Sequence, residues 1–97
     1  MKKIRARILS MTKDDMKFCS ARVIWACLED VENGQKYHVA WAQSPGVIGV
    51  TGTWRSRAQD AFSVAWEKCE VDDVVWLYHP TDSNFNYFEP MNETEAA

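Results

Sequence analysis

The sequence lacks any apolar run that approaches the roughly 20 residues needed to cross a bilayer. Its basic start, "MKKIRARILSMTKDD", is also not followed by the apolar stretch that a signal peptide requires. We therefore expect no membrane span and no export, and the sequence predicts a cytoplasmic protein.

Cysteine and histidine are both scarce. The chain has three cysteines, Cys19, Cys27 and Cys69, with no Cys-x-x-Cys spacing, and it has two histidines. An odd number of cysteines in this pattern argues against a disulfide framework and against a zinc knuckle. We expect no metal site and no cofactor, and we expect the cysteines to be small buried apolar side chains in a reducing compartment.

Catalytic signatures are missing as well. The sequence contains no phosphate-binding glycine loop, dinucleotide-binding fingerprint, nucleophile elbow or metalloprotease motif. Glu29 and His38 could form an acid/base dyad, but no nucleophile accompanies them, so a surface ion pair is the simpler interpretation. We expect a protein that is not an enzyme and has no catalytic residues.

Charge is present in both signs but is distributed unevenly. Residues 1–22 carry seven Lys or Arg against two Asp, a net charge of +5. Residues 23–97 carry four Lys or Arg against twelve acidic residues, a net charge of −8. Small acidic proteins tend to bind basic protein surfaces, so this asymmetry favours a basic protein partner.

The length and the apolar content predict one folded unit. The chain has 97 residues, of which 46% are apolar, and five are tryptophans. This is enough for one domain with a real core. We expect a single α+β domain over residues 1–97, with a mobile acidic tail at about residues 90–97.

Strict alternation predicts a first strand. In "KIRARIL" (residues 3–9), apolar side chains alternate with three basic residues, Lys3, Arg5 and Arg7. This is typical of a half-buried strand with a basic outer face. The polar stretch that follows, "SMTKDDMK" (residues 10–17), predicts a loop or a single helical turn.

The Asn33-Gly34 pair determines how residues 18–31 fold. As a two-residue type I′ turn it would join two strands in a register in which paired residue numbers add up to 67, with Trp25 opposite Ala42. The alternative is a helix, which would give a ferredoxin-like βαββαβ order. We prefer the hairpin because a helix would point Trp25 into solvent and because "RVIW" is rich in β-branched and aromatic residues.

The clearest helix signal starts at a capping box formed by Ser56 and Gln59. Small or apolar residues then recur at helical spacing: Ala58, Ala61, Phe62, Ala65, Trp66 and Cys69. They predict one long helix over about residues 56–69. Further strands are predicted at residues 47–54 and 74–80. The result is a mainly antiparallel sheet of four to five strands with the helix packed on one face.

Part of this order resembles a known family. A strand "YHVAW" is followed by a Pro-Gly turn, a strand "VIGVTGT" and a helix that opens with spaced alanines. These features resemble the HicB-type antitoxin domain over about residues 22–79. The specific matches are Pro45-Gly46, Gly52-Thr53, Ala58 and Ala61. The resemblance implies a partial double-stranded-RNA-binding fold with β-β-β-α-β order, and it implies an antitoxin-like function.

The hairpin places Trp25 on the face of the sheet opposite the helix, among small residues. An exposed tryptophan there is either covered by the aromatic tail or a second copy, or it is a binding hot spot for a partner. The candidate partner-binding residues of this apolar face are Trp25, Cys27, Ala40, Ala42, Tyr87 and Phe88.

Basic side chains suggest a different class of ligand. The candidate nucleic-acid contacts are Lys3, Arg5, Arg7, Arg55 and Arg57. The first strand has no interleaved aromatic residues that could stack on bases, so nucleic-acid binding ranks below protein binding. A small-ligand pocket under Trp25 and the tail aromatics is the other alternative.

We therefore expect a small, non-catalytic, protein-binding inhibitor or regulator. It would be antitoxin-like, or it would be encoded by a phage or mobile element and would mask a basic host nuclease or nucleoprotein. A homodimer is compatible with these expectations, and a membrane partner is not.

Overall fold

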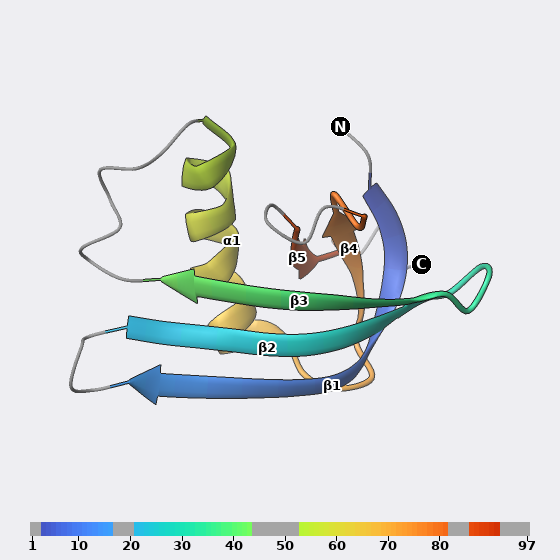
Figure 1. Cartoon of the computed structure of the whole chain (residues 1–97), viewed down its shortest axis with the longest axis horizontal. Coiled ribbons are helices and arrows are strands. Elements are labelled where there is room, and N and C mark those ends of the chain that lie inside the picture. Colours follow the sequence, from blue (N-terminus) through green and yellow to red (C-terminus); the bar gives the residue numbers. More distant parts are fainter. Residues whose placement is uncertain (1–2, 17–20, 44–52, 82–85, 92–97) are drawn as a thin grey trace.

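The computed structural model describes residues 3–16, 21–43, 53–81 and 86–91, without the side chains of residues 16, 21, 41, 43 and 53–59. Its elements in chain order are β1 (Lys3–Met16), β2 (Ala21–Asp30), β3 (Lys36–Gln43), α1 (Thr53–Lys68), β4 (Val74–Tyr78) and β5 (Tyr87–Pro90). The strands form one antiparallel sheet in the order β3-β2-β1-β4-β5, with α1 on one side of it (Figure 1).

This arrangement confirms a sheet-dominated α+β fold, with five strands and one helix in the described residues. The ferredoxin-like alternative is wrong, because residues 21–30 form β2 rather than a helix. Most of the strand predicted at residues 47–54, like the Pro45-Gly46 turn before it, lies outside the described residues. In the described part of the chain, no helix is long and apolar enough to cross a membrane.

β1 is longer than predicted because the polar stretch after Leu9 continues the strand. Residues 10–16 pair with residues 21–27 of β2, so a loop or helical turn there is wrong. The pairing register shifts between Ile8 and Ser10, which marks a β-bulge at Leu9. The first half of β1 pairs with β4 as well as with β2, and Figure 1 shows the strand curving between its two halves.

The inner face of the sheet, which is the face turned toward α1, carries the core. Alternate residues of β2, starting at Ile24, are buried there, and so are Ala6 and Ile8 of β1 as predicted. The helix contributes its small and aromatic stripe. The largest fully buried side chains of the described residues on this side are Phe62, Phe88, Ile8, Ile24, Leu28, Leu77, Val39 and Val75; Tyr87 is also fully buried but points the other way from β5, where it stacks on Tyr78.

The turn between β2 and β3 has four residues, 31–34, between the hydrogen-bonded residues Asp30 and Gln35, rather than two. Asp30 N–H donates to the Gln35 carbonyl at 2.8 Å, and Gly34 N–H donates to the Asp30 carbonyl at 2.9 Å. Only Gly34 has a positive φ, 76°, whereas a type I′ turn needs two such residues. The Asn33 side chain instead accepts the Gln35 N–H at 2.9 Å, so the pair was a correct turn signal with the wrong turn type.

The longer turn moves the strand register by two residues. Paired residue numbers in β2 and β3 add up to 65, and Trp25 lies opposite Ala40 instead of Ala42. Side chains alternate with a period of two, so a shift by two residues leaves every side chain on its predicted face. The hairpin itself is therefore confirmed, while its predicted register is wrong.

The curvature of the sheet brings its two edge strands, β3 and β5, close together at one point. The Asn86 amide, one residue before β5, donates to the His38 carbonyl of β3 at 2.8 Å. α1 packs between these strands through Ala61, Phe62 and Ala65, which are buried. The helix begins at Thr53, so Ser56 lies inside it and is not the predicted capping residue.

A lysine from β1 caps the C-terminal end of α1. Lys13 Nζ donates to the Trp66 carbonyl at 2.7 Å. This carbonyl belongs to the last helical turn, where carbonyls have no partner within the helix and where a positive charge is favourable. The bond therefore ties the second half of β1 to the helix.

We expect Lys13→Met to lower the free energy of unfolding by about 0.5–1 kcal/mol, because it removes both the hydrogen bond and the favourable charge. Urea denaturation followed by circular dichroism would measure the difference. Lys36→Met, at an exposed position of β3, is the matched control and should change stability by less than about 0.5 kcal/mol. Equal effects of the two substitutions would show that Lys13 does not cap the helix.

Candidate functional site

The outer face of the sheet, turned away from α1, carries an exposed tryptophan. Trp25 is 53% exposed in the middle of β2. Its cross-strand neighbours are Thr12 of β1 and Ala40 of β3. Because both neighbours are small, the indole stands above its surroundings. The predicted position of Trp25 opposite the helix is confirmed.

A shallow depression of about 450 Å³ lies beside this indole. We call it the Trp25 depression; its exposed or half-buried lining side chains are Ser10, Thr12, Trp25, Cys27, His38 and Ala40. Its lining combines the apolar side chains of Trp25, Cys27 and Ala40 with two hydroxyls and an imidazole. Such a surface can bind an apolar or aromatic group and still offer it hydrogen bonds.

Two of the residues predicted for the apolar partner-binding face lie in the core instead. Tyr87 and Phe88 have no exposed surface and lie in the core, so their assignment to a partner-binding face is wrong. Tyr87 stacks on Tyr78 with ring centroids 4.9 Å apart, and Phe88 pairs with Leu77. β5 adds to the sheet rather than folding over Trp25, so these two aromatics do not cover the indole.

The remaining predicted residues of the apolar face lie where the alternation puts them. Ala40 and Ala42 are exposed on the outer side of β3, and Cys27 is half-buried on the outer side of β2. Sequence analysis does not identify Ser10 and Thr12, because it predicts a loop or a single helical turn for residues 10–17. The alternation of Ser10 and Thr12 with Met11, which packs against the core, is the signal that could have found them.

The structure separates Glu29 from His38. Across the strands Glu29 faces Lys36, and His38 faces Cys27. The predicted direct pairing of Glu29 with His38, as a dyad or as an ion pair, is therefore wrong. The cause is the four-residue turn, which shifts the register by two residues.

The basic residues of β1 lie on the same outer face, at the end of the sheet away from Trp25. Lys3, Arg5 and Arg7 are all exposed, as predicted. The first strand has no aromatic residue of its own, but the neighbouring strand β4 supplies one. Lys3 Nζ lies 4.2 Å from the ring centroid of Trp76 on β4. Arg55 belongs to α1, but its side chain, like that of residue 57, is outside the described part.

Acidic residues of the β2–β3 hairpin lie next to two of these basic side chains, Arg5 and Arg7. Arg5 Nη2 lies 3.7 Å from Glu32 Oε1, and Arg7 pairs across the strands with Glu29. At ordinary salt such exposed pairs contribute little to stability, but they do lower the positive potential of the surface. The predicted basic face is therefore present but partly neutralised.

The two described cysteines have different surroundings. Cys69 is buried after the end of α1, and burial, together with the nearby Asp73 carboxylate, raises the pKa of its thiol to about 12 despite the opposite effect of Lys13. The thiol is therefore neutral at physiological pH and is not a nucleophile. Cys27 is half-buried in the Trp25 depression, and Cys19 lies outside the described residues.

No family model, no curated protein and no solved structure matches the chain. The resemblance to the HicB-type domain therefore stays a prediction. What the fold and the site define is a sheet-dominated α+β domain with an exposed tryptophan on the sheet face opposite its helix.

Proposed function

We propose that this protein is a small, non-catalytic inhibitor or regulator that binds a protein partner through the Trp25 depression. The exposed indole of Trp25, 53% accessible in a depression otherwise lined largely by small side chains, is the observation that carries this proposal. Tryptophan is the residue type most enriched in binding hot spots, and a single exposed one surrounded by small residues offers a large apolar surface to a partner.

The charge of the chain supports a basic partner. Residues 23–97 carry a net charge of −8, and the chain as a whole carries −3. Charge of this sign speeds association with a basic protein, such as a nuclease or a nucleoprotein, and slows association with nucleic acid. An antitoxin, as in the HicB-type resemblance, would be a regulator of this class.

The test uses the wild-type protein and Trp25→Ala as baits in an extract of the cells of origin, followed by titration calorimetry with each captured protein. We expect Trp25→Ala to weaken the complex at least about 30-fold, the effect of losing a hot-spot tryptophan. Val71→Ala is the matched control, because it truncates another exposed apolar side chain, 46% accessible, in the α1–β4 turn. Equal affinity of Trp25→Ala and wild type for every captured protein would refute the proposal.

Nucleic-acid binding is the second candidate, favoured by the row of exposed cations on β1 with Trp76 beside it. It ranks lower because Glu29 and Glu32 lie next to Arg7 and Arg5. If it is correct, affinity for a single-stranded oligonucleotide falls steeply with salt and is lost in the double substitution of Arg5 and Arg7 by Ala.

A further inference from the structure

The Trp25 depression contains two side chains of the kind that bind metal ions. Cys27 of β2 and His38 of β3 are direct cross-strand partners, and both line the depression. In the same ladder, Asp30 N–H donates to the Gln35 carbonyl at 2.8 Å. By alternation, the Cys27–His38 pair is one without hydrogen bonds between its own backbone groups. Such pairs have Cα atoms about 4.5 Å apart and the closer side chains, so the thiol and the imidazole are neighbours.

One chain supplies only half of a metal site here. Among the described residues of a single chain, no three His, Cys, Asp or Glu side chains are grouped so that they could hold a metal ion. Zn²⁺ takes four ligands in a tetrahedron, and two cysteines with two histidines are one of its usual sets. A second copy related by a two-fold axis would bring the missing thiolate and imidazole.

The hairpin of β2 and β3 is self-complementary about one such axis. A two-fold axis that runs along the strands, above the outer face and between β2 and β3, stacks two copies face to face. It puts each outer-face residue of β2 over the second copy's version of its own cross-strand partner. Sheets stacked in this way lie about 10 Å apart, so side chains from both copies meet in the gap.

The cross-strand pairs fit this stacking in size and in charge. Trp25 pairs with Ala40, so the exposed indole of each copy would lie over a small side chain of the other. Glu29 pairs with Lys36, so a carboxylate would lie over an ammonium group on both sides of the axis. The thiol and the imidazole lie between these two pairs, in the middle of the overlap.

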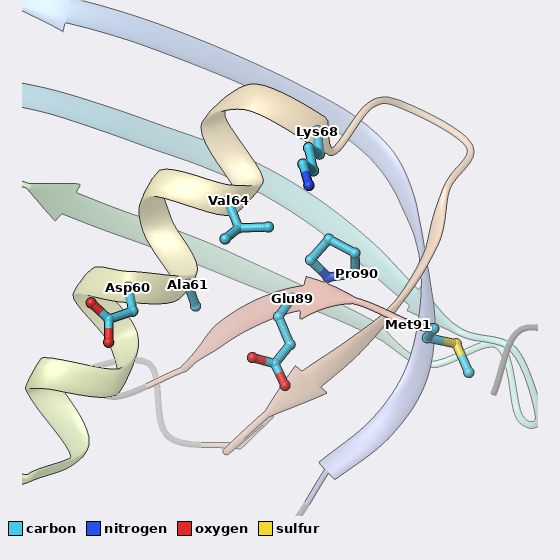
Figure 2. Close-up of a pocket in the computed structure, with 7 residues that line it drawn as sticks. All are labelled: Asp60, Ala61, Val64, Lys68, Glu89, Pro90 and Met91. Carbon is cyan, nitrogen blue, oxygen red and sulfur yellow. The ribbon is translucent and has the colours of Figure 1, made fainter. Parts of the chain in front are cut away.

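The helix side of the molecule offers no comparable set of ligands. A hollow of about 360 Å³ lies there between α1 and β5 (Figure 2). Its described lining includes no cysteine and no histidine. Figure 2 shows the side chains of Asp60 on the helix and Glu89 on β5 pointing in different directions, so their carboxylates do not converge.

We propose that two copies of this chain form a symmetric dimer through their outer faces around one Zn²⁺ ion. Cys27 and His38 of each copy are the four ligands, and each thiol gives up its proton to water as its sulfur binds the metal. The dimer buries both Trp25 side chains and closes the Trp25 depression. A protein partner can then use that depression only on the metal-free monomer, but the dimer itself does not depend on the proposed function.

The test is sedimentation of the purified protein with one Zn²⁺ per two chains, and again with excess chelator. We expect the mass to double with Zn²⁺ and to return to that of one chain when the chelator removes the metal. Co²⁺ in place of Zn²⁺ should give the visible absorption of a tetrahedral site and the ultraviolet band of a metal-bound thiolate. An unchanged mass with Zn²⁺ would overturn the proposal.

Substitutions of the ligands test their assignment. Cys27→Ser and His38→Gln should each abolish the metal-dependent dimer. Cys69→Ala and His79→Gln are the matched controls, because they change a thiol and an imidazole outside the depression, and both should leave the dimer intact. A dimer that survives Cys27→Ser or His38→Gln would overturn the ligand set. Circular dichroism confirms that each variant is folded.

Charge reversal tests the position of the axis. Glu29→Lys puts a lysine over Lys36 of the second copy, and Lys36→Glu puts a glutamate over Glu29, so each variant alone should dimerise at least about tenfold more weakly. A one-to-one mixture of the two variants restores both opposite-charge pairs and should form a heterodimer about as tightly as wild type. Failure of the mixture to do so would overturn this arrangement. Because these measurements use the pure protein, they can fail independently of the capture of a partner.

Discussion

Replacing Phe88 by alanine is expected to lower the free energy of unfolding by about 3–5 kcal/mol, a large part of the roughly 5–15 kcal/mol typical of a small domain. Phe88 has no exposed surface, pairs with Leu77 of β4, and belongs to the core that α1 covers. Truncation leaves a cavity in addition to the lost burial of the ring. Urea denaturation monitored by circular dichroism would measure the change at an unaltered m-value.

Trp25→Ala is the control for this prediction. Tryptophan is larger than phenylalanine, yet Trp25 is 53% exposed on the outer face, so its truncation should cost less than about 1 kcal/mol. A small effect of Phe88→Ala, together with a large effect of Trp25→Ala, would contradict the assignment of the two faces. Both variants are needed, because each tests one side of the sheet.

The faces of the sheet could be predicted from the sequence because they depend only on alternation. In any register of odd sum, odd-numbered residues of β2 pair with even-numbered residues of β3, so Trp25, Cys27 and Ala40 share a face and the wrong turn type did not move them to the other one. The core stripe of α1, with Phe62 and Ala65, was predictable for the same reason, since a period of 3.6 residues is a local property.

The position of the aromatic tail residues in the core could not be predicted from such a periodic pattern. β5 has only four residues, and its pairing with β4 buries Tyr87 against Tyr78 on one side of the strand and Phe88 beside Leu77 on the other. A short run of adjacent aromatics has no period that distinguishes a core strand from a lid over Trp25. The bulge at Leu9 similarly hid the strand character of the residues after it.

The basic face shows how tertiary structure changes the meaning of a local pattern. "KIRARIL" predicts a strongly positive strand, and Lys3, Arg5 and Arg7 are indeed exposed. The β2–β3 hairpin then places Glu32 3.7 Å from Arg5. Because Glu32 follows Arg5 by 27 residues in the chain, no inspection of the first strand could reveal this neutralisation.

Asn86→Asp, which exchanges one nitrogen for an oxygen, is the most sensitive test of the contact between the end of β5 and β3. Asn86 is 6% exposed, and its amide nitrogen donates to the His38 carbonyl at 2.8 Å. Its Oδ1 has no hydrogen-bond partner in the structure. Asn86→Asp replaces the donor by a carboxylate oxygen, which places a buried negative charge against a carbonyl oxygen. We expect a loss of roughly 3–4 kcal/mol at pH 7, because an unpaired buried carboxylate is strongly disfavoured.

The pH dependence identifies the cause of this loss. Burial raises the pKa of the introduced carboxyl above its unfolded value of about 3.9, so the native state binds the proton more tightly than the unfolded state does. The penalty is therefore absent below about pH 4, grows by about 1.4 kcal/mol per pH unit above it, and levels off once pH exceeds the native pKa. Protonated, the carboxyl can again donate to the His38 carbonyl.

The measurement is the difference in unfolding free energy between Asn86→Asp and wild type at pH 4, 5.5 and 7, so that acid effects common to both proteins cancel. Asn33→Asp is the matched control: Asn33 is exposed in the turn, and its Oδ1 accepts the Gln35 N–H at 2.9 Å, a bond that a carboxylate can also make. It should cost less than about 0.5 kcal/mol at every pH. If Asn86→Asp were equally mild, residue 86 would be open to solvent and the contact between β5 and β3 would not hold.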